Sequence, residues 1–182
     1  FFCYVPYNAP HSPWQVPDKY YDKYKKRGLD DKTASAYAMV ENIDDNVGRL
    51  LKKLDDLQIA EETIVLFLTD NGPNSDRYNG KMKGRKGSSH EGGIRVPLFI
   101  RWPGKIKAGT EIPYITAHID LLPTLVDLCD VPMVKGEPLD GVSLEPLLQG
   151  KMSGWKDRMI FTNWGRAGSV RTEQWRAYIK NE

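Results

Sequence analysis

The sequence has few cysteines and no long apolar run. Its two cysteines are Cys3 and Cys129, and their spacing fits neither a disulfide framework nor a cysteine-based metal site. We expect both to be small buried hydrophobic residues. No stretch is long and apolar enough to span a bilayer as a helix. These absences direct the search for function to oxygen-bearing, nitrogen-bearing and charged side chains.

The chain also lacks an excess of charge of one sign, because its formal net charge is +2. Nothing therefore indicates a general affinity for nucleic acid or membrane. Charge is unevenly placed, however, and nine lysines and arginines between Arg77 and Lys107 accompany a single acid, Glu91. Such a segment suits an anionic substrate, with a solvated charged face as the alternative. A non-enzymatic polyanion binder would need more aromatic residues among these charges than Tyr78.

A short apolar run ends in two oxygen-bearing side chains. Residues 63–72 read Thr-Ile-Val-Leu-Phe-Leu-Thr-Asp-Asn-Gly, which is typical of a strand covered on both faces. In open α/β sheets ligands bind beyond the carboxyl ends of the strands, where Asp70 and Asn71 are expected. Their oxygens suit a hard cation such as Ca²⁺. A hairpin turn is the alternative, since Asn-Gly is a strong turn signal.

A candidate cation follows in a glycine-rich segment. Residues 72–93 contain six glycines, and Lys86 lies within Gly84-Arg-Lys-Gly-Ser-Ser-His-Glu-Gly-Gly-Ile-Arg-Val-Pro. Glycines let a backbone approach a ligand closely, and an ammonium group suits a tetrahedral oxyanion. A solvated loop lysine would be the ordinary explanation of Lys86 taken alone.

A candidate imidazole lies near the start of the chain. His11 is flanked by Pro10 and Pro13, and it follows an apolar run that predicts a strand. The prolines stiffen this loop and would fix the direction of the imidazole at the edge of the sheet. Three separate segments thus place an oxygen pair, a cation and a histidine after predicted strands.

Strands and helices alternate along the chain, which predicts an α/β fold with a mainly parallel sheet sandwiched by helices. Asp30 or Asp31 offers an N-cap for a helix to about Gln58, which we expect to cover the sheet with an apolar stripe. Shorter helices are expected at residues 119–129 and 143–148. The predicted strands cover residues 1–5, 63–69, 94–102, 159–164 and 169–179.

Several motifs, in this order and spacing, resemble the sulfatase (arylsulfatase) family of the alkaline phosphatase superfamily. They are Phe-Phe-Cys-Tyr-Val-Pro-Tyr-Asn-Ala-Pro-His-Ser-Pro at 1–13, Leu-Thr-Asp-Asn-Gly-Pro at 68–73, the Lys86 segment, Ile-Asp-Leu-Leu-Pro-Thr-Leu at 119–125 and Leu-Asp-Gly-Val-Ser-Leu at 139–144. The resemblance implies an alkaline phosphatase-like fold. Residues 1–131 would be the C-terminal portion of the catalytic domain. After a Pro/Gly-rich connector, residues 132–182 would begin a smaller C-terminal subdomain.

The resemblance also implies roles for four residues. Asp70 and Asn71 would be Ca²⁺ ligands, while His11 and Lys86 would contact the sulfate and the bridging oxygen. In the family, a Cys or Ser in Cys/Ser-x-Pro/Ala-x-Arg becomes formylglycine, whose hydrate attacks sulfur. Neither cysteine and no serine here fits that motif. We therefore expect a fragment whose nucleophile and further metal ligands precede Phe1, inactive alone and binding calcium weakly at best.

Two related functions remain as alternatives to a sulfuric ester hydrolase. One is a phosphatase or phosphodiesterase of the same superfamily, and the other is a catalytically inactive binding relative. Two-metal phosphoryl enzymes tend to place histidine beside the strand-end aspartate, since imidazole suits zinc, whereas Asn71 favours one hard cation and sulfate. The expected partner is a small sulfate ester or a sulfated glycan, with neither nucleic acid nor membrane. By resemblance, a periplasmic or secreted location is expected.

Overall fold

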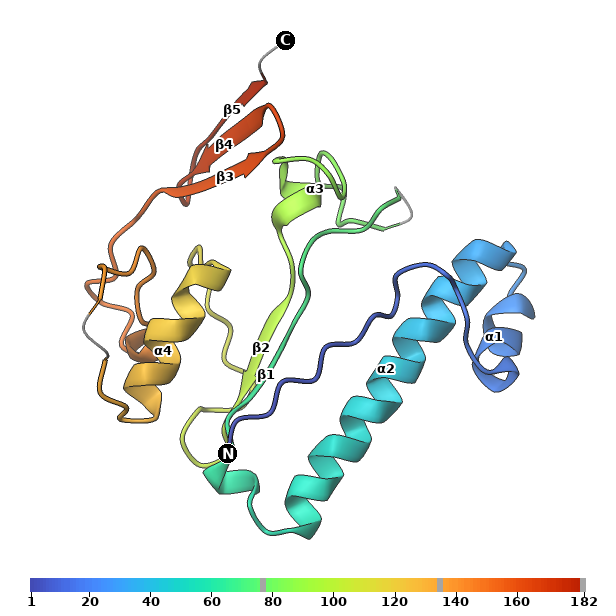
Figure 1. Cartoon of the computed structure of the whole chain (residues 1–182), viewed down its shortest axis with the longest axis horizontal. Helices are drawn as coiled ribbons and strands as arrows, with labels where there is room; N and C mark the ends of the chain where they lie inside the picture. The colour runs from blue at the N-terminus through green and yellow to red at the C-terminus, as the bar shows by residue number, and fades with distance from the viewer. Residues whose placement is uncertain (76–77, 134–135, 181–182) are drawn as a thin grey trace. The chain divides into compact units, whose positions relative to one another are not determined.

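The structure is a computed structural model that describes residues 1–75, 78–133 and 136–180. The chain divides into two compact units, Phe1–Thr63 and Ile64–Glu182. The first unit is helical, and every strand of the described residues lies in the second (Figure 1). The boundary predicted near residue 131 concerns the catalytic domain of a longer protein and stays a prediction.

The first unit is built on two α-helices, α1 (Asp18–Lys25) and α2 (Asp31–Asp56), followed by a 3₁₀ turn, η1 (Ala60–Glu62). Asp30 caps α2, since its carboxylate accepts a hydrogen bond from the Thr33 amide at 3.0 Å. This confirms the predicted start of the long helix and, to within two residues, its end.

Helix α1 packs beside α2, as Figure 1 shows. Tyr20 of α1 is buried, and its hydroxyl donates to Asp45 of α2 at 2.6 Å. Lys23 and Glu41 form an ion pair between the helices at 2.7 Å. The small side chain of Ala38, which is fully buried, lets the helices approach closely.

Three expectations about burial are wrong for the described residues. The opening residues form no strand, and Phe1 is 93% exposed, because no described strand pairs with them. Part of the predicted stripe of α2 is exposed, with Val40 at 51%, because α1 instead covers the face that carries Ala34, Ala38 and Met39. Cys3 and Cys129 are exposed free thiols.

The second unit begins with two paired strands, β1 (Val65–Leu68) and β2 (Leu98–Arg101). They run antiparallel, with Val65 opposite Arg101 and Leu68 opposite Leu98. A parallel pair needs a long crossover, usually a helix. The one helix in the described part of this connection is α3 (Glu91–Ile94), which is too short to provide it. The pairing therefore differs from the parallel arrangement that the sequence predicts.

Beyond β2 a 3₁₀ turn, η2 (His118–Asp120), leads into α4 (Leu121–Leu128), and α5 (Glu145–Leu148) follows. Leu147 of α5 is fully buried at the centre of an apolar core. The partly buried residues packed against that core come from several segments, and they are Leu98, Ile100, Ile106, Ile112, Tyr114, Leu128, Met152 and Trp155.

The chain ends in a three-stranded antiparallel sheet of β3 (Ile160–Trp164), β4 (Ala167–Arg171) and β5 (Arg176–Lys180). Figure 1 shows α3 next to this sheet. Two strands were predicted here, and the turn at residues 172–175 divides the second. Among the described residues, no helix is both long and apolar enough to cross a membrane.

Candidate active site

The predicted metal ligands follow β1, as expected. Asp70 is exposed, and its Oδ1 accepts a hydrogen bond from the Asn71 amide at 2.8 Å. The side-chain amide of Asn71 donates to the Gly72 carbonyl at 3.0 Å, so its oxygen is the atom available to a cation. Nε2 of His118 lies 3.1 Å from the Thr69 carbonyl oxygen, which ties η2 to the end of β1. His118 is a residue that sequence reasoning missed.

The glycine-rich segment folds back on the residues that follow β1. The Gly72 amide donates to Gly93 at 2.9 Å, and the Lys86 amide donates to Pro73 at 2.8 Å. Since Pro73 is three residues past Asp70, the backbone of Lys86 is held close to the predicted metal ligands. The structure therefore holds the backbone of Lys86 near the segment that carries Asp70 and Asn71, and the hairpin-turn alternative does not describe this segment.

The side chain of Lys86 is half-buried and unpaired. Among the described residues, none forms a hydrogen bond or ion pair with its ammonium group. A charged group that has lost part of its hydration and has no partner favours an anion from outside the protein. This is the electrostatic feature that makes the segment a candidate anion site.

Close backbone contact explains the paired glycines at 92 and 93. A Cβ at Gly92 would lie 2.1 Å from the Gly84 carbonyl oxygen, and one at Gly93 would lie 2.2 Å from that of Ser88. Side chains at either position would push the segment apart. The fold of the Lys86 segment therefore depends on the absence of side chains there.

We predict that Gly92→Ala lowers the free energy of unfolding by about 1–3 kcal/mol, because the added methyl must displace backbone atoms. Urea unfolding of the variant measures the loss. Gly48→Ala, in the middle of α2 with open space around its Cβ, is the matched control and should not destabilise the protein. Equal stability of the two variants would contradict the close approach.

Residues 89–91 contact the last two strands. Glu91 lies 2.6 Å from guanidinium nitrogens of both Arg171 and Arg176, and the His90 ring stacks on Tyr178 at 3.9 Å between centroids. Sequence reasoning missed this cluster, since its members are about 80 positions apart in the chain. One signal was visible, namely that Glu91 is the lone acid of a basic segment.

The pKa of His90 is lowered from its ordinary value of 6.5, first by burial and then by the positive charges of Lys83 and Arg176. Below pH 6.5, His90 therefore binds a proton more readily in the unfolded chain than in the folded protein. The stabilising contribution of neutral His90 is complete above pH 6.5, and it is lost as the pH falls through the folded-state pKa.

We expect wild type to melt at a higher temperature than His90→Gln at pH 7.5, because the variant loses the ring stacked on Tyr178. The difference should shrink at pH 5, where protonation of His90 costs wild type alone. Thermal melts at both pH values test this. A difference that stays constant across this range would show that His90 is not held neutral.

His11 belongs to the first unit. It lies in a turn whose His11 amide donates to the Asn8 carbonyl at 2.9 Å, and its Nδ1 is 2.8 Å from the Ser12 carbonyl oxygen. The imidazole is exposed, so it is open to a ligand. Its place beside Lys86 stays a prediction.

Asp70 and Asn71 fit a hard cation in donor chemistry and supply two side-chain oxygens. Within residues 1–75, 78–133 and 136–180, no group of three or more His, Cys, Asp or Glu residues could hold a metal ion. Calcium takes six to eight oxygen ligands in proteins. The pair therefore fits as part of a calcium site and not as the whole of one.

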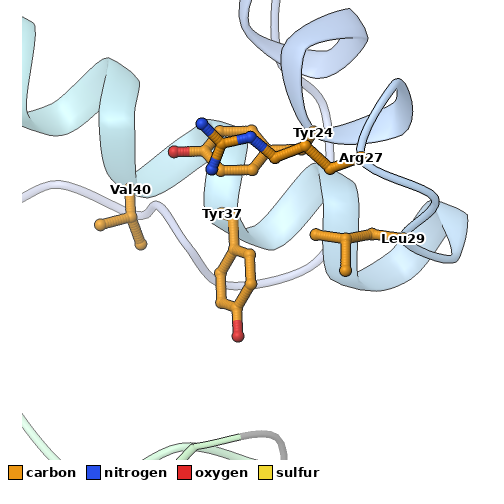
Figure 2. A pocket seen from close by; sticks show the side chains of 5 residues that line it. All are labelled: Tyr24, Arg27, Leu29, Tyr37 and Val40. Atoms are coloured by element: carbon orange, nitrogen blue, oxygen red, sulfur yellow. The ribbon is translucent and has the colours of Figure 1, made fainter.

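A pocket of about 450 Å³ lies in the first unit, at the junction of α1 and α2. Figure 2 shows the guanidinium of Arg27 over the ring of Tyr24, with Tyr37, Leu29 and Val40 completing the lining. The Arg27 guanidinium lies 5.5 Å from the Tyr24 ring centre. None of the four predicted site residues lines this pocket, and its one charged lining residue is the cationic Arg27.

Comparison with protein families identifies the family of the chain. A family model described as Sulfatase matches residues 1–131, and one described as N-sulphoglucosamine sulphohydrolase, C-terminal, matches residues 85–178. The chain belongs to the sulfatase family, which confirms the resemblance in the sequence motifs.

Individual relatives agree as well. The chain is 39% identical over 159 residues to the uncharacterized sulfatase YdeN of Escherichia coli (strain K12), covering 85% of this chain and 28% of that protein. It is 38% identical over 132 residues to human steryl-sulfatase, covering 67% of this chain and 23% of the relative. The chain thus spans about a quarter of the length of these relatives.

Solved structures share the fold. Ps i-CgsB in complex with k-i-k-neocarrahexaose superposes with a TM-score of 0.88 at 29% identity, covering 96% of this chain and 40% of that one. BT4656 in complex with its substrate D-glucosamine-2-N,6-O-disulfate gives a TM-score of 0.56 at 24% identity, covering 84% and 34%. The likeness confirms the predicted α/β, alkaline phosphatase-like fold class. The parallel part of that sheet is not among the strand pairs of the described residues.

Proposed function

We propose that this chain is part of an enzyme that hydrolyses sulfate esters. The observation that carries the proposal is the half-buried residue Lys86, whose ammonium group has no hydrogen-bond or ion-pair partner among the described residues and whose backbone is held beside the segment that carries Asp70 and Asn71. A cation and hard-oxygen ligands on adjoining segments suit a tetrahedral dianion bound next to a metal ion. Membership of the sulfatase family supports sulfate as that group.

Lys86 would bind the sulfuryl oxygens of the ester. Its backbone is held in place before the substrate arrives, because the Lys86 amide is hydrogen-bonded to the Pro73 carbonyl. Preorganised charge of this kind stabilises the negative charge that develops on oxygens in the transition state. His11 would contact the sulfate or donate a proton to the departing alcohol oxygen, and its exposed imidazole is open to a ligand.

Two further groups complete the proposal. Asp70 and Asn71 would hold Ca²⁺, which when bound would supply positive charge to the sulfuryl oxygens. The nucleophile would be a formylglycine supplied by a Cys/Ser-x-Pro/Ala-x-Arg motif elsewhere in a longer chain, since no residue of this sequence fits that motif. The 182 residues alone would therefore not hydrolyse sulfate esters.

The substrate that we propose is a sulfated carbohydrate. The support comes from solved structures in complex with k-i-k-neocarrahexaose and with D-glucosamine-2-N,6-O-disulfate. Human N-acetylgalactosamine-6-sulfatase, 32% identical over 168 residues, is named for a sugar as well. Human steryl-sulfatase is the exception among these relatives, and a sterol sulfate is therefore the comparison substrate.

The full-length protein that contains this chain tests the proposal directly. We expect it to hydrolyse 4-nitrophenyl sulfate faster than 4-nitrophenyl phosphate and to contain calcium. Asp70→Ala should abolish metal-dependent hydrolysis and remove the calcium, because the carboxylate is the one charged ligand of the proposed pair. Calcium content by atomic emission and hydrolysis rates measure both effects.

Asp127→Ala, an exposed aspartate on α4, is the matched control and should keep both calcium and activity. Full calcium content in Asp70→Ala would contradict the ligand assignment. A clear preference for the phosphate ester would favour a phosphatase instead. Absence of hydrolysis of either ester, with calcium bound, would favour a catalytically inactive relative.

A further inference from the structure

Residues Ser89, His90 and Glu91, which we call the 89–91 segment, lie against the last two strands of the chain. The Ser89 carbonyl accepts hydrogen bonds from the Ser169 hydroxyl at 2.8 Å and from the Arg176 guanidinium at 2.7 Å. The Ser89 hydroxyl donates to the Ala167 carbonyl at 3.3 Å. Ser89 is fully buried, so these contacts exclude water from it.

The other two residues of the segment add charge and stacking. Oε1 of Glu91 lies 2.6 Å from Nε of Arg171 and 2.6 Å from Nη2 of Arg176, and the side chain of Glu91 is 24% exposed. Partly buried pairs like these hold their geometry better than solvated ones. The ring of His90 stacks on Tyr178 with an interplanar angle of 21°.

These strand residues share one face of the sheet. Successive side chains of a strand point to opposite faces of the sheet. On β4 the side chains of residues 167, 169 and 171 therefore lie on the same face. The register places Ser169 opposite Tyr178 and Arg171 opposite Arg176, and residues directly opposite each other lie on the same face. All three residues of the 89–91 segment therefore contact one face of β4–β5.

We propose that this face of β4–β5 is the device that positions Lys86, and that Glu91 is its central positioning residue. The inference rests on the proposed function, in which Lys86 binds the sulfuryl group. Lys86 lies three residues before Ser89, and the turn between them is short because the Ser88 amide donates to Arg85 at 3.1 Å. The contacts that hold Ser89 and Glu91 on the sheet therefore also set the direction in which the side chain of Lys86 extends from the backbone.

Two anchors are needed because the segment is rich in glycine. Residues 84–93 include four glycines, and glycine loses more conformational freedom on ordering than any other residue. The first anchor is a pair of backbone hydrogen bonds, from the Lys86 amide to Pro73 and from the Gly72 amide to Gly93. The second is the β4–β5 face, where Glu91 also neutralises two guanidinium groups that would otherwise repel each other and the cationic segment.

The test uses the full-length enzyme and the substrate 4-nitrophenyl sulfate. Glu91→Gln keeps the size of the side chain and removes its charge. We expect kcat to fall by about 10- to 100-fold, because a small displacement of Lys86 costs that much in a preorganised site. Glu173→Gln is the matched control and should leave kcat unchanged, because this half-buried acid in the turn between β4 and β5 forms no ion pair with any other described residue.

A double-mutant cycle shows whether Glu91 acts through Lys86. In a Lys86→Ala background, Glu91→Gln should cause little further loss, since the group that it positions is already gone. Equal fold-losses in the two backgrounds would overturn the proposal. An effect of Glu91→Gln without any effect of Lys86→Ala would refute the proposed function of Lys86 itself, and the inference with it.

Limited trypsin digestion gives a readout that does not depend on activity. Cleavage after Arg85 and Lys86 should be several-fold faster in Glu91→Gln than in wild type or Glu173→Gln, because the segment leaves the sheet more often. Arg176→Lys should fall between wild type and Glu91→Gln, because lysine keeps a charge and loses the paired geometry. Equal cleavage rates in Glu91→Gln and wild type would show that the β4–β5 face does not hold the segment.

Discussion

Replacement of Lys86 by alanine should reduce kcat/KM for a sulfate ester by about 100- to 10,000-fold in the full-length enzyme, with the fold intact. Among the described residues the ammonium group has no hydrogen-bond or ion-pair partner, so its removal takes away transition-state charge stabilisation and breaks no such bond there. Steady-state kinetics with 4-nitrophenyl sulfate and a thermal melt measure the two parts of this prediction.

Two further variants serve as comparisons for Lys86→Ala. Lys107→Ala removes an exposed lysine of the same basic segment and should leave the kinetics unchanged. Lys86→Arg keeps the charge with a wider, planar head group, so it should recover part of the activity. Unchanged turnover in Lys86→Ala would remove Lys86 from the site, and an equal loss in Lys107→Ala would indicate general attraction of the substrate by the basic segment.

The second large effect concerns stability and lies at Asp120. This carboxylate is fully buried, accepts hydrogen bonds from the amides of Ala117 at 2.8 Å and Val142 at 3.0 Å, and lies 2.9 Å from a guanidinium nitrogen of Arg158. We expect Asp120→Ala to lower the free energy of unfolding by about 3–5 kcal/mol, because it strands a partly buried guanidinium and two amide donors.

Urea unfolding followed by fluorescence measures the loss at Asp120. Asp127→Ala, an exposed position on α4, the helix that follows Asp120, should change stability by less than about 0.5 kcal/mol. Asp120→Asn should fall between the two, since one acceptor oxygen survives while an amide replaces the other. If Asp120→Ala and Asp127→Ala unfolded at the same urea concentration, Asp120 would not hold α4 to the segment that precedes α5.

Local signals in the sequence predicted the local features of the fold. The α2 helix was predicted because its apolar spacing and the Asp30 cap act within a few residues, and the cap is present. Asp70 and Asn71 lie just past the end of β1, as the apolar run before them predicts, while their role as metal ligands stays a prediction. Membership of the sulfatase family was likewise visible, since the motifs carry it in order.

The features that failed depend on which segments meet. The alternation of elements predicts the fold class, which is confirmed, but it does not predict which strands pair, and β1 and β2 run antiparallel because a loop joins them. The prediction that Val40 is buried was wrong for a similar reason. The periodicity of a helix shows that one face is apolar, but it does not show which segment covers that face. The pairing of Glu91 with Arg176, 85 residues later, could not be read from either residue alone.

During synthesis the ribosome makes the 89–91 segment before β4–β5. The contact between them can therefore form only after the later strands have been added. The partners of Ser89 and Glu91 come 78 to 87 residues later, so at ordinary synthesis rates the ribosome adds them roughly 4 to 17 seconds afterwards. During that interval the nascent chain already carries Lys86, Asp70 and Asn71, but its glycine-rich loop has no sheet to dock on. A chain that stops before β4 would keep all four proposed site residues and lack the surface that aims Lys86.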